Sequence, residues 1–409
     1  MAFSQTNIGR VRLGKQTAWN DSSITFAARH LTEAEVFIPE LATEMMQTES
    51  MRGDYSAYRS VSGSKANVSV SLKMPLHGWS STTPSADPTA SEQHVDSILL
   101  EYALGATAYS SGFTSKTIAA SPGTTSSTNF GTGDAPPEGY CFGVPISATP
   151  TFAIGWGQDQ STDAMAWIQN LASAAHASSS DVLGSMINHM STASPSTGLV
   201  MNYEGQDANT DITLSNGMVT RLKIMMAPNQ QPTIEADLVF GAWALGTDGA
   251  PGLYEFTLPQ MPVAVGNNGA RMILNNVAVS DVFNVEFEVG IEYEPILGHS
   301  AAEGISQYLV TNRDATMTVT APTTNANTDM STLGGSSVGP LQVDLNTTAG
   351  RMFSILMSDT ILENTRTLGD HNGVVGTTSV YKAGYYDNDG SDTAVGTPPA
   401  DTLVRAAFL

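Results

Sequence analysis

The stretch from Asn284 to Glu294 alternates between apolar residues and carboxylates, and this alternation constrains the fold more than any other feature of the chain. The apolar members are Val285, Phe287, Val289, Ile291 and Tyr293, and the acidic members are Glu286, Glu288, Glu292 and Glu294, interrupted by Gly290. Successive side chains of a strand point to opposite faces of a sheet. The pattern therefore predicts one core face and one face of like charges about 6.6 Å apart. Such a face is tolerated only in water or opposite basic partners. It fits an ordinary solvated sheet, a surface that repels an anion, or a metal site.

Similar alternating or apolar runs recur along the chain, and turn residues separate them, so we expect a mainly β protein. The expected strands are 68–74, 219–224 after a turn at 215–217, 234–238, 312–320, 354–358 and 403–408, with late strands flanking 387–390.

Helical patterns are few, and turn clusters suggest two domains. Segment 91–105 has one apolar face and ends at Gly105, a good helix stop, while 163–176 and 181–189 are weaker candidates. The Ser/Thr/Gly-rich stretches 110–139 and 322–339 predict long loops that serve contacts or become ordered on assembly. The turn cluster at 246–252 predicts a boundary between domains 1–248 and 249–409, whose shared order of features suggests a duplication.

The charge of the chain is strongly negative and unevenly spread. The 409 residues include 17 Lys and Arg against 39 Asp and Glu, a net charge of −22, and no Lys or Arg stands between Lys116 and Arg221. Residues 1–74 are close to neutral, so the excess of acids lies in the rest of the chain. A protein that grips nucleic acid needs clustered basic residues, so we do not expect one here. The acidic body could attract the balanced amino-terminal arm of another copy, or it could simply aid solubility.

Motifs for catalysis, cofactors and metals are poorly matched. Segment 9–16 resembles a phosphate-binding loop but has Gln16 at the hydroxyl position and no room for the preceding strand. The acidic run 387–392 lacks the spacing of a calcium loop and is expected to be a hairpin tip. The seven histidines form no metal motif, and Cys141 is the single cysteine. Because these motifs are not matched, we do not expect an enzyme, a cofactor or a metal. Because there is no apolar run of 18 residues and no signal peptide, we expect no membrane span and a chain made in a cytoplasm.

The order of segments resembles the tail tube proteins of siphophages, long-tailed bacteriophages, in the form that carries two tube domains in one chain. The similar stretches are 33–39 with 59–72, the helix ending Glu-Tyr-Ala-Leu-Gly105, Tyr203–Gly205, 216–224 with 232–243, 275–298, 350–358 and 373–408. The loop 110–139 is an insertion relative to the shortest members.

This resemblance implies two tandem tube domains of β-sandwich or half-barrel type with a few flanking helices. Copies would join sheet edge to sheet edge into rings, three copies giving a pseudo-sixfold ring in preference to six, and the rings would stack into the hollow tube of a virion tail assembled in the host cytoplasm. Other tail proteins (tape measure, terminator, distal tail) would be partners, and genome DNA would pass without specific binding. The acidic face Glu286, Glu288, Glu292 and Glu294 is then the candidate lumen wall that repels DNA.

Under the same resemblance, the amino-terminal arm and the long loops are the expected contacts between stacked rings. The basic residues of that arm which we single out as candidate contacts between subunits are Arg10, Arg12, Lys15, Arg29, Arg52 and Arg59.

Three other function classes remain open from the sequence. A tail terminator or a capsid-decorating protein would form a single ring or sit on a shell. A β-rich surface adhesin would agree with the Arg52-Gly53-Asp54 tripeptide and the Ser/Thr content, but not with the missing signal peptide. An enzyme is the last. Filament formation separates the tube subunit from all of these.

Overall fold

The computed structural model shows a mainly β protein with several antiparallel sheets and a half-barrel, and the residues that it describes include one α-helix. It describes residues 10–21, 26, 31–32, 35–37, 43–49, 58–65, 67–79, 88, 90–109, 116–146, 151–173, 176–204, 212–228, 230–245, 271–279, 282–298, 305–322, 339–363, 367–371, 374–384 and 402–409. The expected class, mainly β with a half-barrel, is confirmed.

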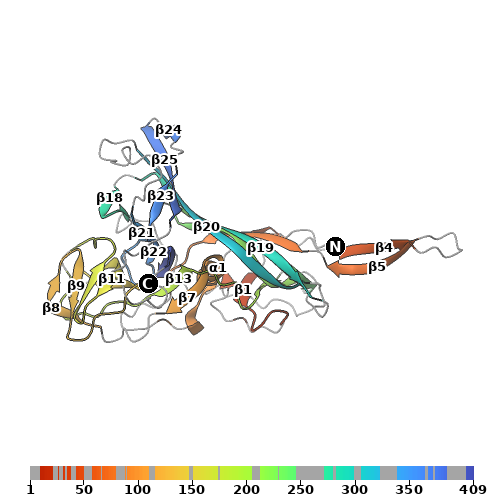
Figure 1. The fold of residues 1–409 in the computed structure, drawn as a ribbon, viewed down its shortest axis with the longest axis horizontal. Helices are drawn as coiled ribbons and strands as arrows, with labels where there is room; N and C mark the ends of the chain where they lie inside the picture. The colour runs from red at the N-terminus through yellow and green to blue at the C-terminus, as the bar shows by residue number, and fades with distance from the viewer. Residues whose placement is uncertain are drawn as a thin grey trace.

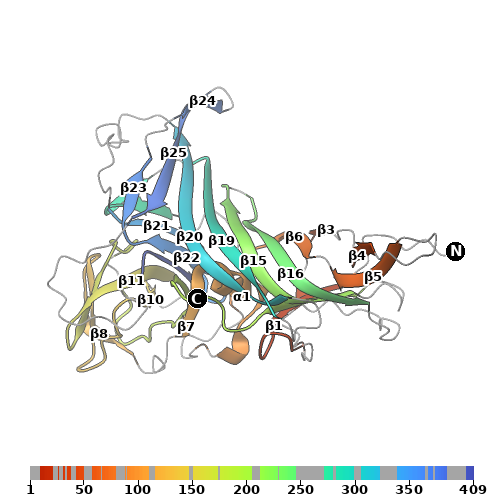
Figure 2. The same ribbon diagram turned by 45° about the vertical axis from the view of Figure 1, so that its right-hand side comes forward.

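A twelve-stranded sheet dominates the described residues, and its long central strands run side by side in Figure 2. The central order is β6-β16-β15-β19-β20-β25, with every neighbouring pair antiparallel. The strands are β1 (Arg10–Lys15), β2 (Leu31–Thr32), β3 (Glu35–Phe37), β6 (Val68–Pro75), β14 (Leu199–Glu204), β15 (Ile212–Met226), β16 (Thr233–Leu245), β19 (Asn284–Leu297), β20 (Ile305–Pro322), β23 (Thr360–Leu362), β24 (Thr367–His371) and β25 (Val374–Ala383).

A second, seven-stranded sheet is built around the carboxyl-terminal strand. The strands, in spatial order, are β18 (Val277–Val279), β17 (Arg271–Leu274), β21 (Leu341–Leu345), β22 (Phe353–Met357), β26 (Val404–Phe408), β13 (Met186–Met190) and β7 (Gly105–Tyr109). Strand β26 is paired on both edges, and it is buried along its whole length, as is Leu409, because one face lies in the main core with Ala406 and Phe408 and the other lies in a second apolar cluster with Ala407. The end of the chain is therefore part of the core.

Two smaller sheets lie at the periphery. The five-stranded sheet has its own apolar cluster and consists of β8 (Ile118–Gly123), β9 (Ser127–Phe130), β10 (Cys141–Pro145), β11 (Phe152–Gln160) and β12 (Ala164–Trp167). The hairpin of β4 (Thr43–Glu49) and β5 (Tyr58–Lys65) forms a two-stranded sheet. Both views show this hairpin standing away from the body, at the opposite end from the five-stranded sheet (Figures 1 and 2).

Helix α1 (Val95–Leu104) fills the space between the two large sheets. It follows the short 3₁₀ turn η2 (Ala90–Glu92) and ends at Gly105, whose φ of 115° is the left-handed conformation that suits a glycine stop. It contacts β15 and β1 on one side and β13 and β7 on the other. Nearly all of its residues are consequently buried, Asp96 and Ser97 included, and it belongs to the main apolar core.

The other two predicted helices are wrong, since those segments are strand and turn. In β12 the burial alternates, with Met165 and Trp167 inward, so the apolar residues have the period of a strand and not of a helix. In β13 all residues but the last are buried because both faces of the strand are covered: Met186 belongs to the main core, where α1 contacts β13, and Ile187 belongs to an apolar cluster with Trp156 of β11. A strand buried on both faces has no polar face to reveal its period.

Two further expectations about loops need correction. The described part of 110–139 is not a structureless loop, because β8 and β9 lie in it and β9 pairs with β12. The turn expected at 215–217 lies inside β15: Asn216 has a φ of 53° and the register with β14 shifts there, which makes a bulge. The segments 323–338 and 385–401, where we expect a loop and a hairpin tip, lie outside the described residues.

The two halves of the chain share both large sheets. Strand β15 of the first half pairs with β19 of the second, and β13 of the first pairs with β26 of the second. The main apolar core also draws on both halves. The division at residues 248/249, which falls outside the described residues, therefore stays a prediction.

Candidate functional site

The solvent side of the large sheet is its most distinctive surface, and we call it the polar face. It comprises the alternate, outward residues of β6, β16, β15, β19, β20 and β25, whose other residues enter the core. In β19 the inward residues Val285, Phe287 and Val289 are at most 5% exposed, which confirms the predicted strand and its core side.

Basic and acidic residues alternate across the strands of the polar face. In the register of the sheet, the residues opposite one another from β6 to β25 are Lys73, Glu235, Lys223, Glu288, Thr316 and Lys382. Opposite charges on facing positions stabilise a sheet, and like charges destabilise it. The order of charges thus fits this strand order.

Ion pairs join neighbouring strands on this face. The pairs are Lys73–Glu235 at 2.8 Å, Arg221–Asp237 at 3.6 Å, Arg221–Glu288 at 2.6 Å, Lys223–Glu286 at 2.8 Å and Lys382–Asp314 at 2.9 Å. The hydrogen bond from Arg221 to Glu288 raises the pKa of the guanidinium, and the bond from Lys382 to Asp314 raises the pKa of that amine. All these side chains are 17–50% exposed, so the pairs face water.

The four predicted carboxylates of β19 fall into two groups. Glu286 and Glu288 are paired with Lys223 and Arg221. Glu292 and Glu294 are exposed, and within the described residues they have no ion-pair partner. Two of the four carboxylates therefore lie opposite basic partners, which come from β15, and the other two face water.

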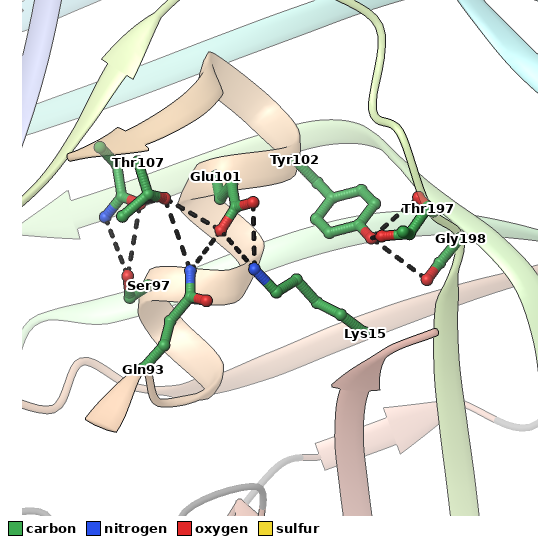
Figure 3. Close-up of polar contacts among 9 residues, drawn as sticks. Lys15, Gln93, Ser97, Glu101, Tyr102, Thr107, Thr197 and Gly198 are labelled. Carbon is green, nitrogen blue, oxygen red and sulfur yellow. Dashed lines mark hydrogen bonds and ion pairs between the residues drawn. The ribbon is translucent and has the colours of Figure 1, made fainter. Parts of the chain in front are cut away.

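The structure does not gather the predicted basic arm at one place. Arg10, Arg12 and Lys15 lie on β1, inside the large sheet, and Arg59 lies on β5 of the projecting hairpin, while Arg29 and Arg52 fall outside the described residues. Lys15 Nζ lies 3.2 and 3.0 Å from the two carboxylate oxygens of Glu101, as Figure 3 shows. That lysine therefore serves a contact within the chain.

Glu101 is the centre of a polar network that connects α1 with both sheets (Figure 3). It accepts hydrogen bonds from Gln93 and from Thr107, the latter at 2.9 Å. The next residue, Tyr102, donates to the carbonyl oxygens of Thr197 and Gly198 at 2.9 and 3.1 Å. Burial raises the pKa of this phenol well above its ordinary value. These groups hold the helix in place between the two large sheets.

A second ionic network lies inside the seven-stranded sheet. The carboxylate of Asp344 accepts from Arg271 Nε at 2.7 Å, from Gln342 Nε2 at 2.8 and 2.9 Å, and from Ser354 Oγ at 2.7 Å. Ser354 in turn accepts from the indole of Trp156, on the five-stranded sheet, at 2.9 Å. Arg271 also donates to the carbonyl oxygen of Ile154. The network therefore holds the five-stranded sheet against the seven-stranded sheet.

The histidine cluster and the cysteine are interior groups. His77 Nδ1 lies 3.2 Å from Asp96 Oδ2, and the His77 and His94 side chains are 5% and 1% exposed. Burial lowers the pKa of His94 to about 4 and raises the pKa of the Cys141 thiol. Among the described residues, no group of three or more His, Cys, Asp or Glu is placed to hold a metal ion.

One open pocket lies beside the end of β13, and Arg313 of β20 is part of its lining. The guanidinium already donates to the carbonyl oxygens of Ala103, Ser191 and Ala193 at 2.6–3.0 Å. These bonds from Nε and Nη1 hold the guanidinium against the end of α1, and among the described residues its buried Nη2 has no hydrogen-bond partner. No helix in the described part of the chain is long and apolar enough to cross a membrane.

No protein-family model matches this chain, and a search of curated proteins finds no significant match. The polar face is thus the feature from which function has to be argued.

Proposed function

We propose that the chain is a structural virion protein: copies join through their sheets into rings, and the rings stack into a hollow tail tube through which DNA passes. The observation that carries this proposal is the large sheet, with one face in the core and the other polar across six strands. Such a sheet can form a wall with a water-filled lumen on its polar side.

The borders of the sheet support joining from copy to copy. Among the described residues, the outer side of the eight-residue β6 is paired only by the three-residue β3. At the other border, β25 is covered by two short strands, β23 and β24. Open sheet borders tend to pair with another chain, and closure into a ring removes them.

The arrangement of hairpins supports two tube units in each chain. The long hairpin β15–β16 comes from the first half, the long hairpin β19–β20 comes from the second, and they lie side by side in one sheet. Three copies would then supply six hairpins, so we favour a trimeric ring with pseudo-sixfold symmetry over a hexamer.

The β4–β5 hairpin is suited to contacts with a neighbouring copy. It projects from the body in both views, with β5 near β16, and a two-stranded hairpin by itself is at best marginally stable in water. In the proposed tail this arm, which includes Arg59, would contact the next ring. Other tail proteins would be partners at the ends of the tube, in a tail assembled in the host cytoplasm.

Electron microscopy of negatively stained protein over a range of concentrations and salts tests the proposal. We expect hollow tubes with a regular repeat, or rings with a central hole. The projection of these rings should have threefold symmetry and approximate sixfold symmetry. Single rings that never stack would favour a terminator instead. Compact monomers under all conditions would contradict the tube and favour a decorating protein or an adhesin.

A further inference from the structure

Every basic side chain on the polar face is held by a carboxylate of an adjacent strand. The six long strands contain five basic residues, and Arg313 is the one whose guanidinium bonds carbonyl oxygens around the end of α1. The other four, Lys73, Arg221, Lys223 and Lys382, lie in the ion pairs of 2.6–2.9 Å described above.

We infer that this pairing makes the polar face a surface along which DNA moves without binding, because it offers phosphates no cation that is free of a carboxylate. The inference rests on the proposed function for the identity of the polyanion, and it adds which residues prevent binding and how. It also differs from simple repulsion by a uniformly acidic wall, since four cations are present and none is available.

The chemistry of phosphate binding explains why pairing matters. DNA affinity comes mainly from Lys and Arg that neutralise phosphates and release counterions. The charge of Arg221 is already compensated by Glu288, to which its Nε donates at 2.6 Å, so a phosphate has to compete with this carboxylate for the guanidinium. The adjacent carboxylate would also repel the phosphate.

The pairing also explains why cations are present at all. Adjacent strands are about 4.8 Å apart, so a face of carboxylates on every strand would place like charges opposite one another and destabilise the sheet. Alternating signs remove this cost. The seven acids against four bases on the face leave an excess of three negative charges, and Glu292 and Glu294 supply two of them.

The test uses two double variants of the full chain that remove the same number of negative charges from the same strand. E286Q/E288Q releases Lys223 and leaves Arg221 only its longer contact with Asp237, whereas E292Q/E294Q releases no basic side chain. Binding of a fluorescent duplex DNA is measured by anisotropy on unassembled subunits, from about 20 to 200 mM salt.

We expect E286Q/E288Q to bind the duplex at least ten-fold more tightly than either the wild type or E292Q/E294Q. Its affinity should fall with salt with a log–log slope of about −1 to −2, as one or two released cations predict. Adding R221Q and K223Q to this variant restores the wild-type net charge and should abolish the gain. Circular dichroism verifies that all the variants are folded.

Equal DNA binding by the two double variants, whether both gain affinity or neither does, would overturn the inference, because net charge alone would then account for the surface. This measurement does not require tubes. A chain that forms no tube but shows the expected difference would contradict the proposed function only, and tubes without the difference would contradict the inference only.

Discussion

Two arginine–carboxylate pairs, one on the polar face and one inside the seven-stranded sheet, have nearly the same geometry and opposite surroundings. Arg221 and Glu288 lie 2.6 Å apart with side chains 42% and 33% exposed, whereas Arg271 and Asp344 lie 2.7 Å apart with side chains 19% and 3% exposed. Exposed pairs contribute little to stability, while breaking a buried pair leaves a charge without compensation. The same chemistry therefore sets the properties of a surface in one place and holds sheets together in the other.

The largest expected effect comes from breaking the buried pair. Asp344→Ala removes the acceptor of Arg271, Gln342 and Ser354 at once, and we expect a loss of about 3–5 kcal/mol in the free energy of unfolding. Urea unfolding followed by tryptophan fluorescence measures it. Asp314→Ala, at the exposed pair with Lys382, is the matched control and should cost under about 1 kcal/mol. Similar losses for both variants would show that burial does not separate the two kinds of pair.

The second prediction concerns His94, a buried group that stays neutral in the folded protein, in contrast to the buried charges of Arg271 and Asp344. Burial lowers the pKa of His94 to about 4, from 6.5 in the unfolded chain. The nearby Asp96 raises this pKa and so opposes the effect of burial, but only in part. Between these values the unfolded chain takes up a proton that the folded chain does not, so stability is fully present above pH 6.5 and declines as the pH falls towards 4.

From pH 7 to pH 5 this histidine should therefore cost roughly 2 kcal/mol, and the variant His94→Gln should lose less stability over the same interval by about that amount. Chemical unfolding of both proteins at the two pH values gives the difference. Parallel pH profiles would mean that His94 is protonated as readily in the folded protein as in the unfolded chain.

The elements that could be predicted from the sequence are those whose burial follows a single period. Strand β19 has one face in the core and one in water, so its alternation is visible, and β6 and the end of β20 share this property. Helix α1 could be located from its apolar residues and Gly105, although its sequence does not show that sheets cover it on both sides.

What could not be predicted depends on neighbours that are distant in sequence. Strand β13 has no visible period because both its faces are buried, Met186 in the main core beside α1 and Ile187 against an apolar cluster that includes Trp156 of β11. In the candidate site, the sequence pattern indicated the carboxylates of β19. It did not indicate that Arg221, 67 residues before Glu288, pairs with that carboxylate. Only the register of β15 with β19 decides that an apparent row of like charges is half neutralised.

The smallest expected effect is on the stability of the polar face itself. Glu288→Gln breaks the short bond to Arg221, but both side chains are in contact with water and Arg221 keeps Asp237 at 3.6 Å, so the free energy of unfolding should fall by under about 1 kcal/mol. Adding about 0.5 M salt should shrink even this difference, since exposed charges are screened. Thermal unfolding of the two proteins at low and high salt provides the measurement. A loss as large as that of Asp344→Ala would mean that the exposed pairs hold the sheet together. The main role of the ion pairs on the polar face would then be to stabilise the fold and not to keep cations from a passing polyanion.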